Sequence, residues 1–221
     1  MIRAVLLDAL GTLVELKPPA PRLREALRRE GFEVSESRAA AGIGAEIAYY
    51  LDHHLEGYDR ESLDELRDRC ARRMRRALEI PDLDHATARR AMMGALEFAP
   101  YPDAIPALHG LRDRGLTLVI ASNWDCSLPD WLGPAGLIDL VDGVVTSADA
   151  RAAKPHPAVF ARALEVAGVE PKEALHVGDS VRNDVAGAQA AGIRGLLVAR
   201  GGEAPPGVET VRSLEEVASL I

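Results

Sequence analysis

The sequence is poor in the residues that build disulfide frameworks and zinc sites. Its two cysteines, Cys70 and Cys126, lie far apart and outside any Cys-x-x-Cys or Cys/His pattern. No stretch reaches the roughly 18 apolar residues of a membrane span. The first residues also lack the basic segment and long apolar core of a targeting peptide. We therefore expect a cytoplasmic protein with reduced cysteines and no membrane partner.

Positive charge is also scarce. The chain has 26 Lys and Arg residues against 34 Asp and Glu residues, which leaves a formal net charge of -8. A surface of that sign repels nucleic acids and anionic membranes, so no nucleic acid is expected as a partner. The 221 residues, of which 48% are hydrophobic, suffice for one good core and a second, smaller module.

An apolar run near the start of the chain, residues 4–7, ends abruptly at Asp8 and then turns through Gly11. Such a run is typical of a buried parallel strand, and open α/β sheets place their chemistry at the carboxyl ends of their strands. Asp8 is therefore a candidate nucleophile. Taken alone, the position is equally consistent with an aspartate that only caps a turn.

The chain between residues 17 and 98 has the pattern of a helical insert. Residues 17–21, Lys-Pro-Pro-Ala-Pro, are expected to form a stiff connector, because this composition does not propagate a helix or a central strand. Ser62 and Glu65 have the spacing of a capping box for the third helix. The spacing of apolar residues predicts four helices, approximately at 22–30, 37–55, 62–78 and 85–98.

Beyond residue 99 short apolar strands alternate with helices, and one of these helices is expected at 184–191. This alternation implies right-handed crossovers and a parallel sheet covered on both faces, to which the first strand also belongs. The prediction is an α/β fold. A Rossmann-like, doubly wound core of residues 1–16 and 99–221 carries an inserted all-helical domain of residues 17–98. The further strands are expected at 116–121, 143–145, 174–177 and 195–198.

Chemistry-bearing side chains follow four of these strands. Because parallel strands end at one edge of the sheet, Asp8, Ser122-Asn123, Lys154 and Asp179 should gather there. The set contains a nucleophile, hydrogen-bond donors and a compact positive charge, which are the groups that transfer of a phosphoryl or similar anion requires. The converging carboxylates also make an oxygen-rich site suited to Mg²⁺.

The pattern resembles the haloacid dehalogenase-like hydrolase superfamily over nearly the whole chain. The residues that carry the resemblance are the four segments 8–13, 122–123, 154–157 and 178–184, in this order and at strand ends. The resemblance implies that Asp8 attacks the substrate and is transiently esterified. It also implies that Ser122 and Lys154 are catalytic, and that the helical insert is a mobile cap. The substrate-binding residues that it implies are Gly11, Thr12, Ser122, Asn123 and Lys154.

The same resemblance implies a Mg²⁺ site. Its ligands would be Asp8, the backbone carbonyl of Leu10 and Asp179, and Asp184 would support the metal or Lys154. The implied activity is that of a magnesium-dependent phosphohydrolase acting on a small phosphorylated metabolite. A small anionic substrate is the expected partner, and a monomer or a homodimer is the expected state.

Position 10 departs from the pattern of the family's phosphatases. They usually carry a second aspartate two residues after the nucleophile as the general acid, and here that residue is Leu10. Loss of such a group costs about 10²- to 10⁴-fold in rate, least for leaving groups that need no protonation. A halide is one such group, so Leu10 favours the alternative of a 2-haloacid dehalogenase that works through an ester at Asp8. Asp52, His53 or His54 of the insert are further candidates to replace the acid.

Position 179 favours the phosphohydrolase, because dehalogenases of this family do not keep that metal-binding aspartate. They also hold water with an asparagine two residues later, where this chain has Val181. Phosphonate cleavage needs a lysine in the cap. The three lysines of the chain are Lys17, Lys154 and Lys172, and Lys17 lies in the connector, so this activity is discounted. A third alternative is a non-catalytic binder of a phosphorylated ligand or partner.

Overall fold

Strand β1 (Ala4–Leu7) lies at the centre of a six-stranded sheet in the computed structural model, which describes residues 1–201 and 205–221. All four of its residues are buried. Helices cover both faces of a parallel sheet, which is why the strand is apolar throughout rather than alternating. Its neighbours are β4 (Thr117–Ser122) and β6 (Ala174–Gly178), and both run parallel to it.

The remaining strands extend this sheet on both sides. Strand β5 (Gly143–Thr146) pairs with β4, while β7 (Arg194–Val198) and β8 (Thr210–Val211) follow β6, all in parallel register. The strand order is therefore β5-β4-β1-β6-β7-β8. This architecture confirms the predicted doubly wound parallel sheet. The two-residue strand β8 was not predicted, because it is too short to produce a periodic signal.

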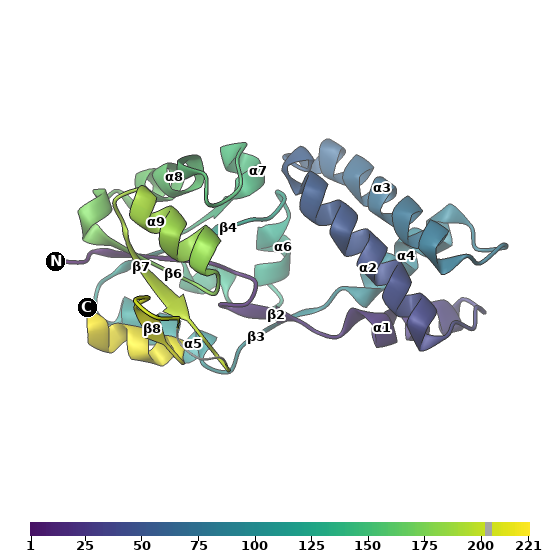
Figure 1. Cartoon of the computed structure of the whole chain (residues 1–221), viewed down its shortest axis with the longest axis horizontal. Helices are drawn as coiled ribbons and strands as arrows, with labels where there is room; N and C mark the ends of the chain where they lie inside the picture. Colours follow the sequence, from purple (N-terminus) through teal and green to yellow (C-terminus); the bar gives the residue numbers. More distant parts are fainter. Residues whose placement is uncertain (202–204) are drawn as a thin grey trace. The chain divides into compact units, whose positions relative to one another are not determined.

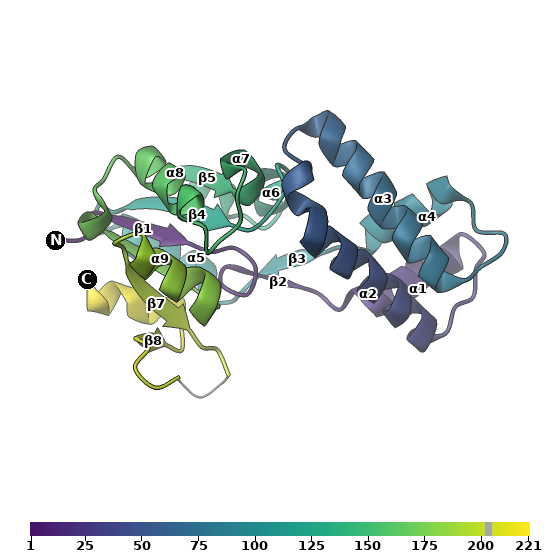
Figure 2. The same cartoon turned by 45° about the horizontal axis from the view of Figure 1, so that its top comes forward.

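Helices cover both faces of the sheet, as Figures 1 and 2 show. On one face, α8 (Pro157–Ala167) and α9 (Gly187–Ala190) pack over the strands, and Phe160 of α8 is fully buried among strand residues such as Leu6. On the other face, α5 (Ala104–Arg112) packs against β4 and against the C-terminal 3-10 helix. The further short helices are α6 (Leu128–Leu132), α7 (Ser147–Ala150) and the 3-10 helices Ile138–Leu140, Pro171–Glu173 and Leu214–Leu220.

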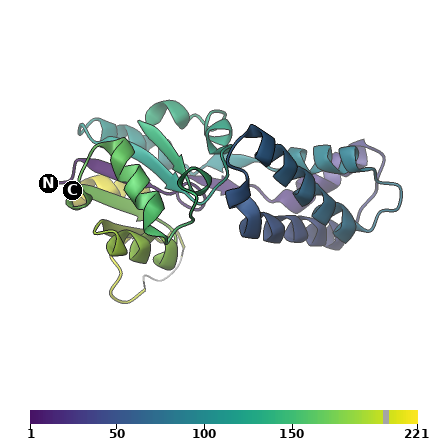
Figure 3. The same cartoon turned by 90° about the horizontal axis from the view of Figure 1, so that it is seen from above.

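The described chain separates into two units. The sheet unit contains Met1–Glu15 and Ala99–Ile221, and the helical unit contains Leu16–Phe98. Within the helical unit, the long helices α2 and α3 lie side by side, as the blue helices of Figure 3 show. Across residues 1–201 and 205–221, no helix combines the length and apolarity needed to span a membrane. The helices of this unit are α1 (Pro19–Arg29), α2 (Glu36–His53), α3 (Arg60–Leu78), α4 (His85–Ala95) and the 3-10 helix His54–Glu56.

The predicted connector 17–21 is wrong in its second half, because α1 begins at Pro19. Prolines are tolerated in the first turn of a helix, where the missing N–H would have no partner in any case. The predicted capping box of Ser62 and Glu65 is also wrong. Helix α3 begins earlier, and its box is formed by Asp59 as N-cap and Ser62 as the third helical residue.

The fourth predicted helix is too long at its C-terminal end. Helix α4 ends at Ala95, and β3 (Phe98–Pro100) then pairs with β2 (Val14–Leu16) in a two-stranded sheet. These two strands lie at the entry to the helical unit and at the exit from it along the chain. Neither was predicted, because three-residue strands give no periodicity of their own.

The predicted helix 184–191 differs in kind. Residues Val181–Ala186 form a π-helix, and only the last turn, α9, is α-helical. Single π turns often lie at functional sites. Here the π-helix contains Asp184, one of the predicted site residues.

Candidate active site

Asp8 follows β1 directly and is buried, with 6% of its surface exposed. Its Oδ1 accepts a hydrogen bond from Ser122 Oγ at 2.8 Å and another from Lys154 Nζ at 2.7 Å. Ser122 is the last residue of β4, the strand next to β1. Adjacent parallel strands therefore bring these two side chains together, and Lys154 meets them from the loop before α8.

Lys154 bridges two carboxylates. Its Nζ lies 2.7 Å from Asp8 Oδ1 and 2.5 Å from Asp184 Oδ1. Asp184 is further held by His176 Nε2 at 2.9 Å and by the backbone N–H of Ser180, which donates to Oδ2 at 2.9 Å. His176 itself is fully buried in β6.

Burial and charge shift the pKa values of these groups in different directions. Burial, reinforced by the charge of Asp184, raises the pKa of Asp8 against the effects of Lys154 and Ser122. Burial opposes the ionisation of Asp184, but its hydrogen bond from His176 and the charge of Lys154 hold its pKa well below the usual range. Burial also disfavours the charge on Lys154, yet the two carboxylates raise its pKa. Lys154 therefore stays charged and offsets the negative charge at the centre of the site.

Burial lowers the pKa of His176, so this ring is neutral and donates its Nε2 proton to Asp184. The ring also packs edge-on against Phe160, with 5.1 Å between the ring centroids. These two contacts fix the orientation of the imidazole. His176 thereby holds Asp184 Oδ1, the same oxygen that Lys154 contacts.

Asp179 follows β6 and completes a group of three carboxylates. One oxygen from each of Asp8, Asp179 and Asp184 lies within 4.8 Å of the others. Partial burial and the charges of Asp8 and Asp184 raise the pKa of Asp179 to about 6. Mutually repelling carboxylate oxygens at such separations are the donor set that Mg²⁺ prefers, so the residues present fit this ion.

Gly11 lets the loop after β1 approach this group closely. Its φ is +85°, and a Cβ placed on it would lie 2.0 Å from Asp179 Oδ2. Only glycine avoids both problems at this position. The neighbouring Leu10 has 42% of its surface exposed, and Thr12 is fully buried.

Asn123 lies against Lys154 rather than in open space. Its Oδ1 accepts from the backbone N–H of Lys154 at 2.7 Å, and its Nδ2 donates to the carbonyl of Lys154 at 3.1 Å. Both polar ends of the side chain therefore hold the backbone that carries the lysine. The structure thus brings together Asp8, Ser122, Lys154, Asp179 and Asp184, with Leu10, Gly11, Thr12 and Asn123 beside them.

His53 and His54, two candidates to replace the general acid, each contact a backbone carbonyl of α2. His53 Nδ1 lies 2.8 Å from the carbonyl of Tyr49, whose ring stacks on the imidazole at a centroid distance of 3.9 Å. His54 is buried, and its Nδ1 lies 3.0 Å from the carbonyl of Leu51. Each ring is therefore held through its Nδ1.

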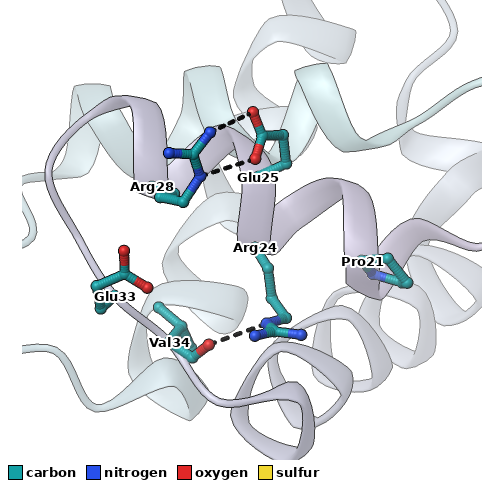
Figure 4. Close-up of a pocket in the computed structure, with 6 residues that line it drawn as sticks. All are labelled: Pro21, Arg24, Glu25, Arg28, Glu33 and Val34. Carbon is teal, nitrogen blue, oxygen red and sulfur yellow. Dashed lines mark hydrogen bonds and ion pairs between the residues drawn. The ribbon is translucent and has the colours of Figure 1, made fainter.

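A hollow of about 240 Å³ lies elsewhere in the helical unit, beside α1 (Figure 4). Both cations drawn in this view are engaged. Arg28 pairs with Glu25, and Arg24 Nε donates to the carbonyl of Val34 at 3.0 Å. None of the predicted site residues lines this hollow.

Arg200 was not predicted as a functional residue, and its guanidinium donates to the carbonyl of Thr12 at 2.6 Å. The one available signal was its position two residues after β7, because functional residues in open α/β sheets lie at the carboxyl ends of the strands. A single arginine in that position has no motif around it. Its role becomes visible only from its contacts.

Comparison with known proteins shows relatives that include a phosphatase. The glyceraldehyde 3-phosphate phosphatase of Methanopyrus kandleri is 30% identical over 216 residues, covering 91% of this chain and 85% of that protein. The haloacid dehalogenase-like hydrolase domain-containing protein 3 of Bos taurus is 46% identical over 92 residues, or 42% of this chain. In that alignment the chain spans only 37% of the relative's length.

Solved structures of a phosphatase and of a dehalogenase share the fold over almost the whole chain. A phosphatase from Thermococcus onnurineus is 27% identical with a TM-score of 0.68, covering 99% of this chain and 97% of the other. The L-2-haloacid dehalogenase of Xanthobacter autotrophicus is 26% identical with a TM-score of 0.71, covering 100% and 98%. A family model described as haloacid dehalogenase-like hydrolase matches residues 2–192. With its sheet, its strand-end carboxylates and this match, the chain belongs to the haloacid dehalogenase-like hydrolase family.

Proposed function

We propose that the protein is a Mg²⁺-dependent phosphohydrolase that acts on a small phosphorylated metabolite through an aspartyl-phosphate at Asp8. The observation that carries this proposal is the group of Asp8, Asp179 and Asp184, whose carboxylate oxygens lie within 4.8 Å of one another. A site for carbon–halogen hydrolysis has no need of three converging carboxylates. A bound divalent cation would offset the repulsion between three carboxylates that lie this close together.

The nucleophile is Asp8, and its two oxygens have different roles. The hydrogen bonds described for this carboxylate, from Ser122 and Lys154, both go to Oδ1. Oδ2 therefore keeps the lone pair that attacks phosphorus, while Oδ1 is held in place. The P–O bond to the leaving group breaks as the Oδ2–P bond forms, and water later hydrolyses the aspartyl-phosphate to release inorganic phosphate.

Lys154 and Ser122 supply donors around the reacting group. Lys154 is charged and nearly inaccessible to solvent, so its field is weakly screened where the phosphoryl oxygens would lie. Gly11 and Thr12 shape the loop beside it. Asn123 holds the backbone of Lys154 and thereby places its ammonium.

Asp8, the carbonyl of Leu10 and Asp179 would hold the Mg²⁺, and Asp184 would support it by fixing Lys154. When bound, this ion offsets the charge repulsion between the nucleophile and the anionic substrate. Burial and the charges of Asp8 and Asp184 make the ionised form of Asp179 costly, as its raised pKa shows, and a bound cation would offset this cost.

Two alternatives remain, each with its own support. A 2-haloacid dehalogenase needs no proton for its leaving halide, which suits the exposed Leu10 in place of an acid. It is also the activity of the structurally similar L-2-haloacid dehalogenase of Xanthobacter autotrophicus. A non-catalytic binder of a phosphorylated ligand would use the same donors, although a buried nucleophilic carboxylate is a poor neighbour for a permanently bound anion.

One parallel assay separates the three. The wild type and Asp8→Asn are tested with p-nitrophenyl phosphate and with 2-chloropropionate, each with Mg²⁺ or EDTA. Asp113→Asn, which changes an exposed aspartate at the end of α5, is the matched control. Phosphate release that requires Mg²⁺ and Asp8 supports the proposal. Chloride release in EDTA supports the dehalogenase, and stabilisation by a phosphate ester without turnover supports the binder.

A further inference from the structure

Arg200 connects three segments of the sheet unit that are distant in the sequence. Its Nη1 lies 2.8 Å from each carboxylate oxygen of Asp103, and its Nη2 donates to the carbonyl of Thr12 at 2.6 Å. Its guanidinium carbon also lies 3.9 Å from the centroid of the Tyr101 ring. The planar guanidinium stacks on the Tyr101 ring with its face and forms hydrogen bonds along its edge. A lysine ammonium cannot reproduce this geometry.

The anchor of this arrangement is Asp103, at the start of α5. Its Oδ2 also accepts from Ser213 Oγ at 3.1 Å and from the backbone N–H of Leu214 at 2.8 Å. The side chains of Arg200 and Asp103 are only 22% and 13% exposed, so solvent screens the pair less than an ordinary surface pair. Asp103 is therefore fixed from several directions, and it fixes Arg200 in turn.

The loop that Arg200 binds is the one that carries the nucleophile. Within it the carbonyl of Ala9 accepts the backbone N–H groups of Leu13 and Val14, at 2.8 and 2.9 Å. These bonds tie the turn to itself. The hydrogen bond from Arg200 to the Thr12 carbonyl ties the turn to the segment that follows β7. Because Gly11 precedes Thr12 and abuts Asp179, a displacement of Thr12 would shift the contact between Gly11 and Asp179.

Arg200 also contacts the two segments of the sheet unit that precede and follow the helical unit along the chain. Thr12 lies two residues before β2, and Tyr101 directly follows β3. The backbone N–H of Tyr101 donates to the carbonyl of Leu13 at 2.9 Å, so the outgoing and returning segments are bonded to each other where Arg200 meets them. One guanidinium thus holds the nucleophile loop and the base of the two connecting strands.

We infer that Arg200 is a positioning residue for the proposed reaction: by clamping the Thr12 carbonyl to Asp103 and Tyr101, it holds the nucleophile loop in the geometry that the reaction needs. It does not touch the reacting atoms. The kinetic part of this inference rests on the proposed function. The structural part, an ordered loop from Ala9 to Val14, does not.

The test compares Arg200→Met and Arg200→Lys with the wild type by two readouts. The first is amide hydrogen exchange at Leu13, Val14 and the strand β4, and the second is kcat and KM for p-nitrophenyl phosphate with Mg²⁺. We expect faster exchange at Leu13 and Val14 in Arg200→Met while β4 is unchanged. We also expect kcat to fall about 10- to 100-fold, because small displacements of reacting groups are costly, with KM changed less than about threefold. Arg200→Lys should recover only a small part of kcat.

Arg194→Met is the matched control, because it breaks an ion pair with Glu209 at the other end of the same strand. It should leave loop exchange and kcat unchanged. Should Arg200→Met not fold, Asp103→Asn weakens the same clamp while leaving the Arg200 to Thr12 bond possible, and the same changes are expected at smaller size.

Three results would overturn the inference. The first is unchanged exchange at Leu13 and Val14 in Arg200→Met. The second is exchange that rises equally in β4, which marks general destabilisation. The third is faster loop exchange with full kcat in an active enzyme. A wild type that releases no phosphate contradicts the proposed function instead, and the exchange result then decides alone whether Arg200 orders the loop.

Discussion

Gly11 and Asp179 lie so close together that a single Cβ on Gly11 would sit 2.0 Å from the Oδ2 of Asp179. The contact joins the loop after β1 to the loop after β6, two neighbouring strands of the sheet. It brings the backbone of the nucleophile loop beside one carboxylate of the proposed metal site. Any side chain at position 11 must therefore displace either the nucleophile loop or the carboxylate of Asp179.

The substitution Gly11→Ala should damage the site more than the fold. The alanine is strained at φ +85° and displaces the Asp179 carboxylate, so we expect Mg²⁺ to bind about 10- to 100-fold more weakly, as measured by titration calorimetry. Gly168→Ala is the control, because Gly168 has φ +65° but open space around its Cβ position. It should show the backbone strain without the loss of Mg²⁺ affinity. Equal Mg²⁺ affinity in both variants would contradict this role of Gly11.

Leu10→Asp should change which substrates are used. A carboxyl at this exposed position offers a proton to the leaving oxygen, so we expect turnover of alkyl phosphates to rise by up to about 10²-fold while aryl phosphates change little. The measurement is kcat/KM across phosphate esters of increasing leaving-group pKa. The slope should be steep in the wild type and shallower in the variant. Val181→Asp places a carboxylate at another exposed position near Asp179 and should leave the slope steep.

Lys154→Met should abolish turnover and destabilise the sheet unit. Removing the shared cation leaves Asp8 and Asp184 buried without their ion-pair partner, a loss of about 3–5 kcal/mol. The loss should shrink as the pH falls from 8 to 5. The pKa of Asp8 is raised by burial, and without Lys154 it rises further, so protonation at low pH removes the unpaired charge.

Denaturant unfolding at pH 5 and pH 8 measures this difference. Lys172→Met, at an exposed position, is the control and should match the wild type at both pH values. A deficit for Lys154→Met that grows at low pH would mean that the unpaired carboxylates are not its cause.

Glu46→Gln should alter the pH dependence of stability. Glu46 of α2 is buried, with 5% of its surface exposed, and burial raises its pKa from 4.5 to about 7 against a hydrogen bond from Cys70. A carboxyl whose folded pKa is raised stabilises the fold below its unfolded pKa and loses that contribution as the pH rises through 7. The shift corresponds to about 3 kcal/mol, lost mostly between pH 4.5 and 7.

The free energy of unfolding of the helical unit should therefore decline over this pH range in the wild type and less steeply in Glu46→Gln. Glu36→Gln, at an exposed position in the first turn of the same helix, should keep the wild-type slope. Parallel pH profiles for the wild type and Glu46→Gln would show that Glu46 ionises without cost.

Much of the fold followed from local patterns. The apolar runs that became β1, β4, β5, β6 and β7 are each bounded by turn residues, and alternation with helices implied the parallel sheet. The short strands β2, β3 and β8 escaped prediction because their pairing depends on partners far along the chain. The start of α1 at Pro19 was not predicted because prolines, which do not propagate a helix, are tolerated in its first turn. The π-helix at Asp184 was not predicted because its form is set by surrounding contacts.

The sequence alone determined which side chains follow the strands, and therefore that Asp8, Ser122, Lys154 and Asp179 share one edge of the sheet. Connectivity and strand periodicity are local properties, and they suffice for that conclusion. The tertiary structure decided how these groups pair: that Lys154 bridges Asp8 and Asp184, that His176 holds Asp184, and that Arg200 clamps the nucleophile loop. Such pairings depend on distances of a few ångströms between segments far apart in the chain, and no local pattern carries that information.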